Sequence, residues 1–328
     1  MARQRNVPII RPPARPAGPP GLASVLGGTE ARRNWVKYWI EQPLGGAGEL
    51  AVYYLFRLLP IDLCSKLGAM RGRHVGAARR KLEAQARKAL TVAAPALPAS
   101  EIDALLDRLH RNSGRALLET LIMDRVWNAR RVAIVPEHRR LDLTDPSRSR
   151  IFVSVHTGNL GDLLGMCLMQ LIGPRGMTVS RRLPNRFRQR LSEKLRSKHG
   201  ASVLEPGLRT TRQLLDHLRT PGGAILIHLD EARGKQIYFP TFGRPMPYGS
   251  NLSLAIRLAA ATGAPLTPVH MQRIAGTRFD LRVHDDLAAP AARNEEQQAA
   301  IAACLDRLFE RVIREQLDDW QQLYFLRP

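Results

Sequence analysis

The stretch VSVHTGNLGDLLGM, residues Val153 to Met166, places a histidine and a carboxylate where an apolar strand is expected to give way to a helix. A neutral imidazole can accept a proton near pH 7, so His156 is a candidate general base. Asp162 is the expected acid that fixes its tautomer. Gly158 allows a sharp turn and Asn159 can cap the next helix. The alternative is a structural histidine, with Asp162 as a charge at a helix N-terminus.

Two more expected strand ends carry polar clusters. One holds Arg181 and Arg182, and the other holds His228, Asp230 and Glu231. Ligands of open α/β sheets bind where the strands end, so substrates are expected here. A metal site would combine His228, Asp230 and Glu231 with His156. No close ligand triplet accompanies them in the sequence, so neither a metal nor another cofactor is predicted.

Four short apolar runs end in polar residues and must position these groups: RSRIFVSVHTGN, GMTVSRR, GGAILIHLDE and GAPLTPVHMQR. Helical patterns separate or follow them over residues 163–171, 184–199, 210–219 and 252–262. Strands that alternate with helices predict an α/β fold, with a largely parallel mixed sheet flanked by helices.

The chain divides into three expected regions. Residues 1–24 are rich in Pro and Arg and are expected to form a disordered basic arm. Residues 25–132 read as a helical region and residues 133–328 as the α/β core. Aromatic rings and cations between Trp35 and Arg71 suit helices at a lipid head-group interface, although core helices of a soluble bundle fit the pattern equally well. Glu49, Arg57 and several glycines argue against a membrane span.

The composition is strongly basic, with 50 Lys and Arg against 29 Asp and Glu and a net charge of +21. Such a field favours nucleic acid, anionic lipid or an acidic carrier protein. The basic run SRRLPNRFRQRLSEKLRSK contains only one aromatic residue, Phe187, and no nucleic-acid-binding signature is found, so nucleic acid is not a predicted partner. Three separated cysteines and no secretory signal in the first 23 residues predict a cytoplasmic location.

Seven stretches follow one another in a particular order: RLLPIDLCSKLGAMRG, NSGRALLETL, HTGN, SRRLPNRF, HLDEARGK with FPTFGRP, AIRLAAATGAPLTPVHMQR and a last helix ending near Trp320. Together they resemble the lipid A biosynthesis acyltransferases, the lauroyl and myristoyl transferases within the wider lysophospholipid acyltransferase group.

The resemblance implies O-acyl transfer from acyl carrier protein, or acyl-CoA, to a hydroxyl of a glycolipid such as a lipid A precursor, or of a lysophospholipid. It implies a peripheral or monotopic enzyme on the cytoplasmic face of the inner membrane, with residues 25–132 associating with the membrane surface. His156 would deprotonate the acceptor, and backbone N–H groups around Gly158 would stabilise the oxyanion.

The other site residues carry two expected roles. Substrate binding is expected of Gly158, Asn159, Arg181, Arg182, Asp230 and Glu231. Binding of the acidic carrier protein is expected of Arg186, Arg188, Arg190, Lys194 and Arg196.

Two departures from the family pattern bear on these roles. The family acid would fall at Gly161, one residue before Asp162, and Arg182 replaces the usual proline after Arg181. The competing hypothesis is therefore a basic protein that binds anionic lipid or nucleic acid and carries a degenerate acyltransferase site.

Overall fold

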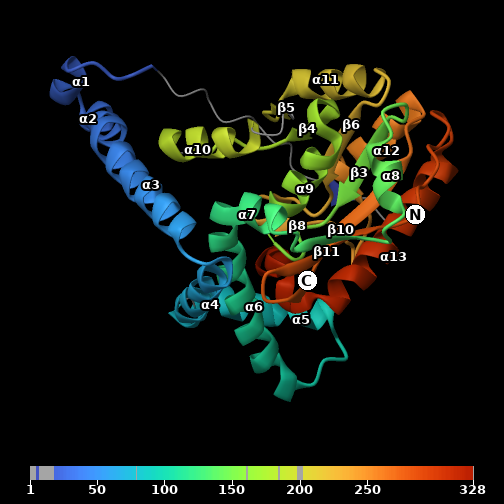
Figure 1. Ribbon diagram of the computed structural model, residues 1–328, viewed down its shortest axis with the longest axis horizontal. Helices are drawn as coiled ribbons and strands as arrows, with labels where there is room; N and C mark the ends of the chain where they lie inside the picture. The colour runs from blue at the N-terminus through green and yellow to red at the C-terminus, as the bar shows by residue number, and fades with distance from the viewer. Residues whose placement is uncertain are drawn as a thin grey trace.

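The computed structural model describes residues 5–6, 18–78, 80–159, 162–183, 185–197 and 202–327 (Figure 1). Its centre is a seven-stranded sheet in the order β2-β11-β10-β3-β6-β4-β5. The strands are β2 (Val132–Val135), β3 (Arg150–Ser154), β4 (Gly176–Val179), β5 (Ser202–Leu204), β6 (Ala224–His228), β10 (Leu266–Ala275) and β11 (Arg278–Val283).

The sheet is largely parallel, which confirms the predicted fold class. β3 pairs in parallel with β6 on one side and with β10 on the other, and only β10 and β11 pair antiparallel. The four predicted strands are β3, β4, β6 and β10. The four predicted helices are α9 (Asp162–Ile172), α10 (Arg186–Ser197), α11 (Leu208–Leu218) and α12 (Asn251–Thr262).

Both faces of the sheet are buried, as a parallel sheet requires. Along β3, Ile151 and Val153 belong to one apolar cluster and Phe152 to the other, because successive side chains point to opposite faces. The first cluster includes side chains of α5 (Arg80–Ala93), α6 (Ala99–Glu119), α12 and α13 (Glu295–Glu315). The second includes α7 (Met123–Asn128), α8 (Arg139–Thr144) and α9.

The N-terminal helices extend away from this body (Figure 1). They are α1 (Ala23–Leu26), α2 (Thr29–Val36), a π-helical segment (Lys37–Glu41) and α3 (Gln42–Leu58), and they precede α4 (Ile61–Ala78), which packs closely against α6. Large apolar side chains are exposed along them, including Leu26, Trp39, Leu44, Tyr54, Leu55 and Leu58. Among the residues that the structure describes, no helix is long and apolar enough to cross a membrane.

Most of the predicted basic arm lies outside the described residues. Of residues 1–17, only Arg5 and Asn6 are described, and they form β1, which pairs in parallel with β9 (Pro247–Tyr248). A second small pair joins β7 (Ala232–Arg233) to β8 (Gln236–Ile237).

Candidate active site

The strand register brings His156 and Asp230 together. Ser154, the last residue of β3, pairs with His228, the last residue of β6, and the two site residues each follow two positions later. Nδ1 of His156 lies 2.6 Å from Oδ1 of Asp230, and the backbone N–H of His156 donates to Oδ2 at 2.9 Å. An ionised carboxylate only accepts, so the imidazole proton belongs on Nδ1, which leaves Nε2 as the basic nitrogen.

Asp230 is fully buried and held by several donors. The indole Nε1–H of Trp320 donates to its Oδ2 at 2.9 Å. Burial opposes the charged form of each partner, but their mutual attraction outweighs it. The pKa of Asp230 is therefore lowered and the pKa of His156 is raised.

This geometry corrects the expected pairing of His156 with Asp162. Asp162 lies in the first turn of α9, and Asp230 holds Nδ1 instead. Asp162 still adds a weaker attraction that raises the pKa of His156. The chain order could not give this result, because it does not say which strands are neighbours. Gly161, the position of the family acid, lies outside the described residues.

The turn after His156 is held by β10, the neighbour of β3 on the other side. The hydroxyl of Thr157 donates to the carbonyl of Met271 at 2.9 Å, and Arg273 donates from Nη2 to the carbonyl of Gly158 at 2.9 Å. Gly158 has a φ of 74°, and a Cβ there would lie 2.7 Å from the Met271 carbonyl oxygen. Only glycine fits this position, as the sequence predicted.

Asn159 differs from its expected role in substrate binding. It is fully buried, and its Nδ2 donates to Oε2 of Glu119 at 3.0 Å. The same carboxylate accepts from the hydroxyl of Ser65 and from both terminal nitrogens of Arg273, each at 2.7–2.8 Å. Asn159 is therefore part of the support beneath the turn.

Sequence reasoning did not single out Glu119, Arg273 or Trp320, although each lies in or beside a stretch that carries the family resemblance. Asp319, the neighbour of Trp320, also contacts Arg273, with 3.2 Å between Oδ2 and Nε. Burial raises the pKa of Asp319 to about 7, even though Arg273 lowers it. These charged residues could have been found in the sequence because each interrupts an apolar helical or strand pattern. A charge in such a pattern indicates a buried residue that is paired with an opposite charge.

Glu231 uses one carboxylate oxygen for protein contacts, while its Oε2 is buried without a hydrogen-bond partner among the described residues. Its Oε1 lies 2.7 Å from Arg233 and accepts the N–H of Asn251, the first residue of α12. Burial raises the pKa of Glu231 to about 7, although Arg233 lowers it.

His228 stacks on His156, with ring centroids 4.2 Å apart. Burial lowers the pKa of His228 to about 3, so this ring is neutral. Ligand atoms of His156, His228 and Asp230 lie within 4.8 Å of one another. The sequence did not show this ligand triplet, because His156 and Asp230 follow different strands. The 2.6 Å hydrogen bond between Nδ1 of His156 and Oδ1 of Asp230 already joins two of its members.

Arg181 and Arg182 follow β4 and are both exposed. Arg181 donates to the carbonyl of Ala232, in β7, at 3.3 Å. Arg182 lies 3.6 Å from Glu205. Arg181 therefore reaches toward the segment that follows Asp230, whereas Arg182 pairs with a carboxylate beyond β5.

The basic helix α10 packs against α3, and this contact engages two of the five predicted carrier-binding residues. Arg186 lies over the ring of Tyr38 at 3.7 Å, and Arg188 donates from Nε to Glu49 at 2.9 Å. Arg190 and Lys194 are exposed on the helix surface. The side chain of Arg196 lies outside the described part of the chain.

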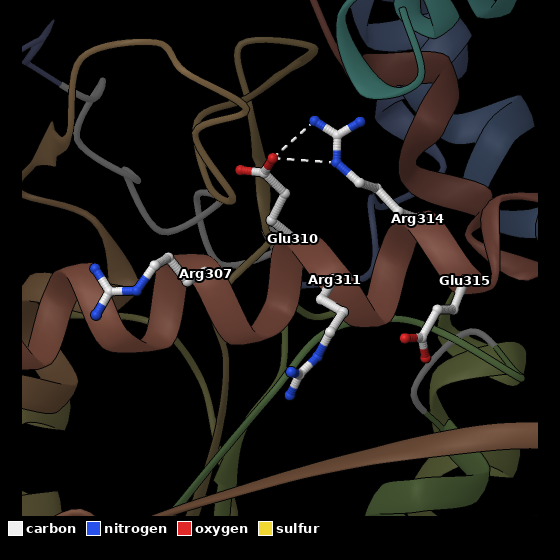
Figure 2. Close-up of a pocket in the computed structure, with 5 residues that line it drawn as sticks. All are labelled: Arg307, Glu310, Arg311, Arg314 and Glu315. Carbon is white, nitrogen blue, oxygen red and sulfur yellow. Dashed lines mark hydrogen bonds and ion pairs between the residues drawn. The ribbon is translucent and has the colours of Figure 1, made fainter. Parts of the chain in front are cut away.

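A surface hollow of about 400 Å³ lies on α13, away from these residues in the sequence (Figure 2). It is lined by Arg307, Glu310, Arg311, Arg314 and Glu315. Figure 2 shows Arg314 turned toward Glu310, whereas Arg311 and Glu315 project from another side of the helix. The side chains do not converge on one point, so we assign this hollow no ligand.

The fold and site thus define an α/β protein with a partly exposed histidine held by a buried aspartate at the strand ends. The sequence model for the bacterial lipid A biosynthesis acyltransferases matches residues 33–326, and the chain belongs to that family. Its reaction needs an acyl donor and a lipid acceptor.

A comparison with solved structures also matches the chain to the 1-acyl-sn-glycerophosphate (LPA) acyltransferase PlsC from Thermotoga maritima. The sequence identity is 12%, the TM-score is 0.37, and the match covers 74% of this chain and 98% of that one. No curated protein sequence matches the chain.

Proposed function

We propose that this acyltransferase moves a fatty acyl chain from acyl carrier protein to a hydroxyl of a glycolipid such as a lipid A precursor, with His156 as general base. The observation that carries the proposal is the 2.6 Å contact between Nδ1 of His156 and Asp230 in a chain of this family. It leaves Nε2 of a correctly oriented imidazole to meet the acceptor.

The reaction needs no covalent acyl-enzyme. Nε2 of His156 takes the proton of the acceptor hydroxyl as its oxygen attacks the thioester carbonyl. The tetrahedral intermediate then collapses, the carbon–sulfur bond breaks, and the imidazolium returns the proton to the thiolate. Asp230 stabilises the imidazolium between these steps without itself taking the proton.

The reaction also requires a hydrogen-bond donor that stabilises the negatively charged oxygen of the tetrahedral intermediate. The N–H groups of Thr157 and Asn159 donate to the carbonyls of Val155 and Thr157, at 2.9 and 2.8 Å. They are engaged, so the N–H of Gly158 is the donor in this turn that we assign to the oxyanion. Arg181, at the end of β4, is the side chain that we expect to add positive charge at the reacting groups.

The two macromolecular partners are assigned from surface chemistry. Exposed Arg190 and Lys194 on α10 suit an acidic carrier protein. The exposed apolar side chains of α1 to α4 suit the head-group region of the inner membrane, on its cytoplasmic face. The protein would then lie on the membrane as a peripheral or monotopic enzyme.

The rival hypothesis is a degenerate site on a basic lipid-binding protein. The dyad favours the enzyme, because a protein that only binds anions gains nothing from a buried carboxylate that orients a histidine. The test uses purified protein with two kinds of donor, acyl carrier protein and CoA, each charged with acyl chains of several lengths. A panel of glycolipids and lysolipids serves as acceptors, and the products are measured by mass spectrometry.

We expect a product one acyl chain heavier, formed by the wild-type protein and lost in His156→Ala. The matched control is His217→Ala, which replaces a histidine on α11 whose Nε2 lies 2.8 Å from the carbonyl oxygen of Arg175. Acyl transfer by His156→Ala at the wild-type rate, or no transfer by wild-type protein with any donor and acceptor, would refute the proposal.

A further inference from the structure

Each residue of the turn from His156 to Asn159 is held by a contact from outside the turn, and these contacts come from β10, from α6 and from the segment after β6. His156 is held by Asp230 after β6, Thr157 by Met271 of β10, Gly158 by Arg273 of β10, and Asn159 by Glu119 of α6. Three of these four supports are charged, and two of them, Arg273 and Glu119, are bonded to each other.

The Arg273–Glu119 pair has the geometry of a rigid clamp. Nη1 and Nη2 of Arg273 each lie 2.8 Å from a separate oxygen of Glu119, a bidentate arrangement that fixes both planes. The side chain of Glu119 is 1% exposed and that of Arg273 is 9% exposed. Arg273 also lies over the ring of Phe279, with its Cζ 4.6 Å from the centroid.

The clamp bonds directly to the turn at two points. Nη2 of Arg273 donates to the carbonyl of Gly158, and Oε2 of Glu119 accepts from the side chain of Asn159. Arg273 therefore fixes the Gly158–Asn159 peptide group through the Gly158 carbonyl. Glu119 fixes Asn159 through its side-chain amide. Gly158 has a φ of 74°, and a backbone this permissive needs such supports to keep one conformation.

We propose that Arg273 and Glu119 are positioning residues that set the backbone of the His156–Asn159 turn for acyl transfer, without contacting either substrate. The inference rests on the proposed function, because it assigns these residues to the same reaction. The turn carries both the base and the Gly158 N–H, and a displacement of about 1 Å at such groups can cost about a hundredfold in rate.

The first test is steady-state kinetics on Arg273→Lys and Glu119→Gln. Lysine keeps the buried positive charge opposite Glu119 but cannot reach two carboxylate oxygens and the Gly158 carbonyl together. We expect kcat to fall about tenfold to a hundredfold in each variant, with KM for donor and acceptor nearly unchanged. The double variant should fall no further than the worse single variant, because both changes break one clamp.

The matched control is Arg150→Lys. Arg150 is a buried arginine at the opposite end of β3, paired with Asp142 and with Asp286 at 3.2 Å. We expect Arg150→Lys to lower the melting temperature about as much as Arg273→Lys does, with kcat unchanged. If the two variants lose stability and kcat in equal measure, the role of Arg273 is only structural and the proposal fails.

A second readout does not require turnover. In protein labelled with ¹⁵N-histidine, the proton between Nδ1 of His156 and Asp230 should give a far-downfield NMR signal, identified by its loss in His156→Ala. We expect that signal to shift or broaden in Arg273→Lys and Glu119→Gln but not in Arg150→Lys. An unchanged signal in both clamp variants would overturn the positioning role, even if the protein proved to have no acyltransferase activity.

Discussion

Asp230 and Asp162 both lie close enough to His156 to raise its pKa, but only Asp230 contacts its ring. A carboxylate at Nδ1 selects the tautomer and orients the ring, whereas a charge further off only attracts the cation. The two acids should therefore be separable by substitution.

We expect Asp230→Asn to lower kcat by about a hundredfold or more, because an amide can donate to Nδ1 and favour the wrong tautomer. Asp162→Asn should cause a much smaller loss. The measurement is kcat at saturating donor and acceptor, with melting temperatures to detect unfolding. A larger loss in Asp162→Asn would return the role of orienting acid to Asp162.

The pH dependence follows from the same contacts. Burial alone would lower the pKa of His156, and Asp230 more than compensates, so the pKa lies above its ordinary value. The base must be neutral, so kcat/KM should rise with pH and level off above that raised pKa.

In Asp230→Asn the attraction is gone and burial remains, so the midpoint of the pH profile should move to lower pH. Glu231→Gln removes a weaker attraction and should give a smaller shift in the same direction. A midpoint that stays in place in Asp230→Asn would mean that another group limits the rate.

His156 could be singled out from sequence as a candidate base because Gly158, two residues later, indicates a sharp turn at the end of a strand. Its partner could not, because Asp230 lies 74 residues later and reaches His156 only through the pairing of β3 with β6. The Glu119–Arg273 clamp was hidden for the same reason, since α6 and β10 meet only in the folded chain.

Among the elements, α10 has two surfaces with different surroundings. One surface packs on α3, where a Cβ at Gly46 would come within 2.5 Å of Phe187 and where Asn185 donates to the carbonyl of Gln42. The other presents Arg190 and Lys194. The sequence predicted one basic helix, but α3 lies about 140 residues earlier, so the division of its cations needed the structure.

We expect the double variant Arg190→Glu with Lys194→Glu to have a higher KM for acyl carrier protein, and that KM should depend less on salt. The kcat should be nearly unchanged, because exposed charges affect the encounter of the two proteins over about 8 Å at physiological salt. Kinetics at two salt concentrations test this. The control is Arg212→Glu on α11 with Arg219→Glu at the C-terminal cap of the same helix, which changes the net charge equally. Equal effects of the two pairs would point to general charge rather than to a docking site on α10.

Over the whole molecule, apolar exposure is uneven. Large exposed apolar side chains gather on α1 to α4, and Leu58 is 82% exposed there. The mixture of aromatic and basic residues predicted helices in this region, but it left a membrane surface and a soluble core equally possible. The exposure of these side chains favours the membrane surface.

We expect the wild-type protein to bind vesicles that contain anionic phospholipid, and to stay bound in moderate salt but not in detergent. Replacing Leu44, Leu55 and Leu58 together with Gln should weaken vesicle binding by at least about tenfold, because their burial in the interface is lost. Leu141→Gln, on α8, replaces a leucine that is 81% exposed and should have no effect. Equal flotation of the triple variant and wild type would exclude α3 as the docking element.

The Glu119–Arg273 clamp also limits how this protein can be dissected. A fragment that began at residue 133 would keep His156, Asp230 and all of the sheet except Val132 of β2, but it would leave the guanidinium of Arg273 with Asp319 as its remaining buried acid. It would also uncover the apolar sheet face on which α5 and α6 pack. Ser65, on α4, donates to Glu119 as well, so the shortest piece that retains every support of the turn must start before α4.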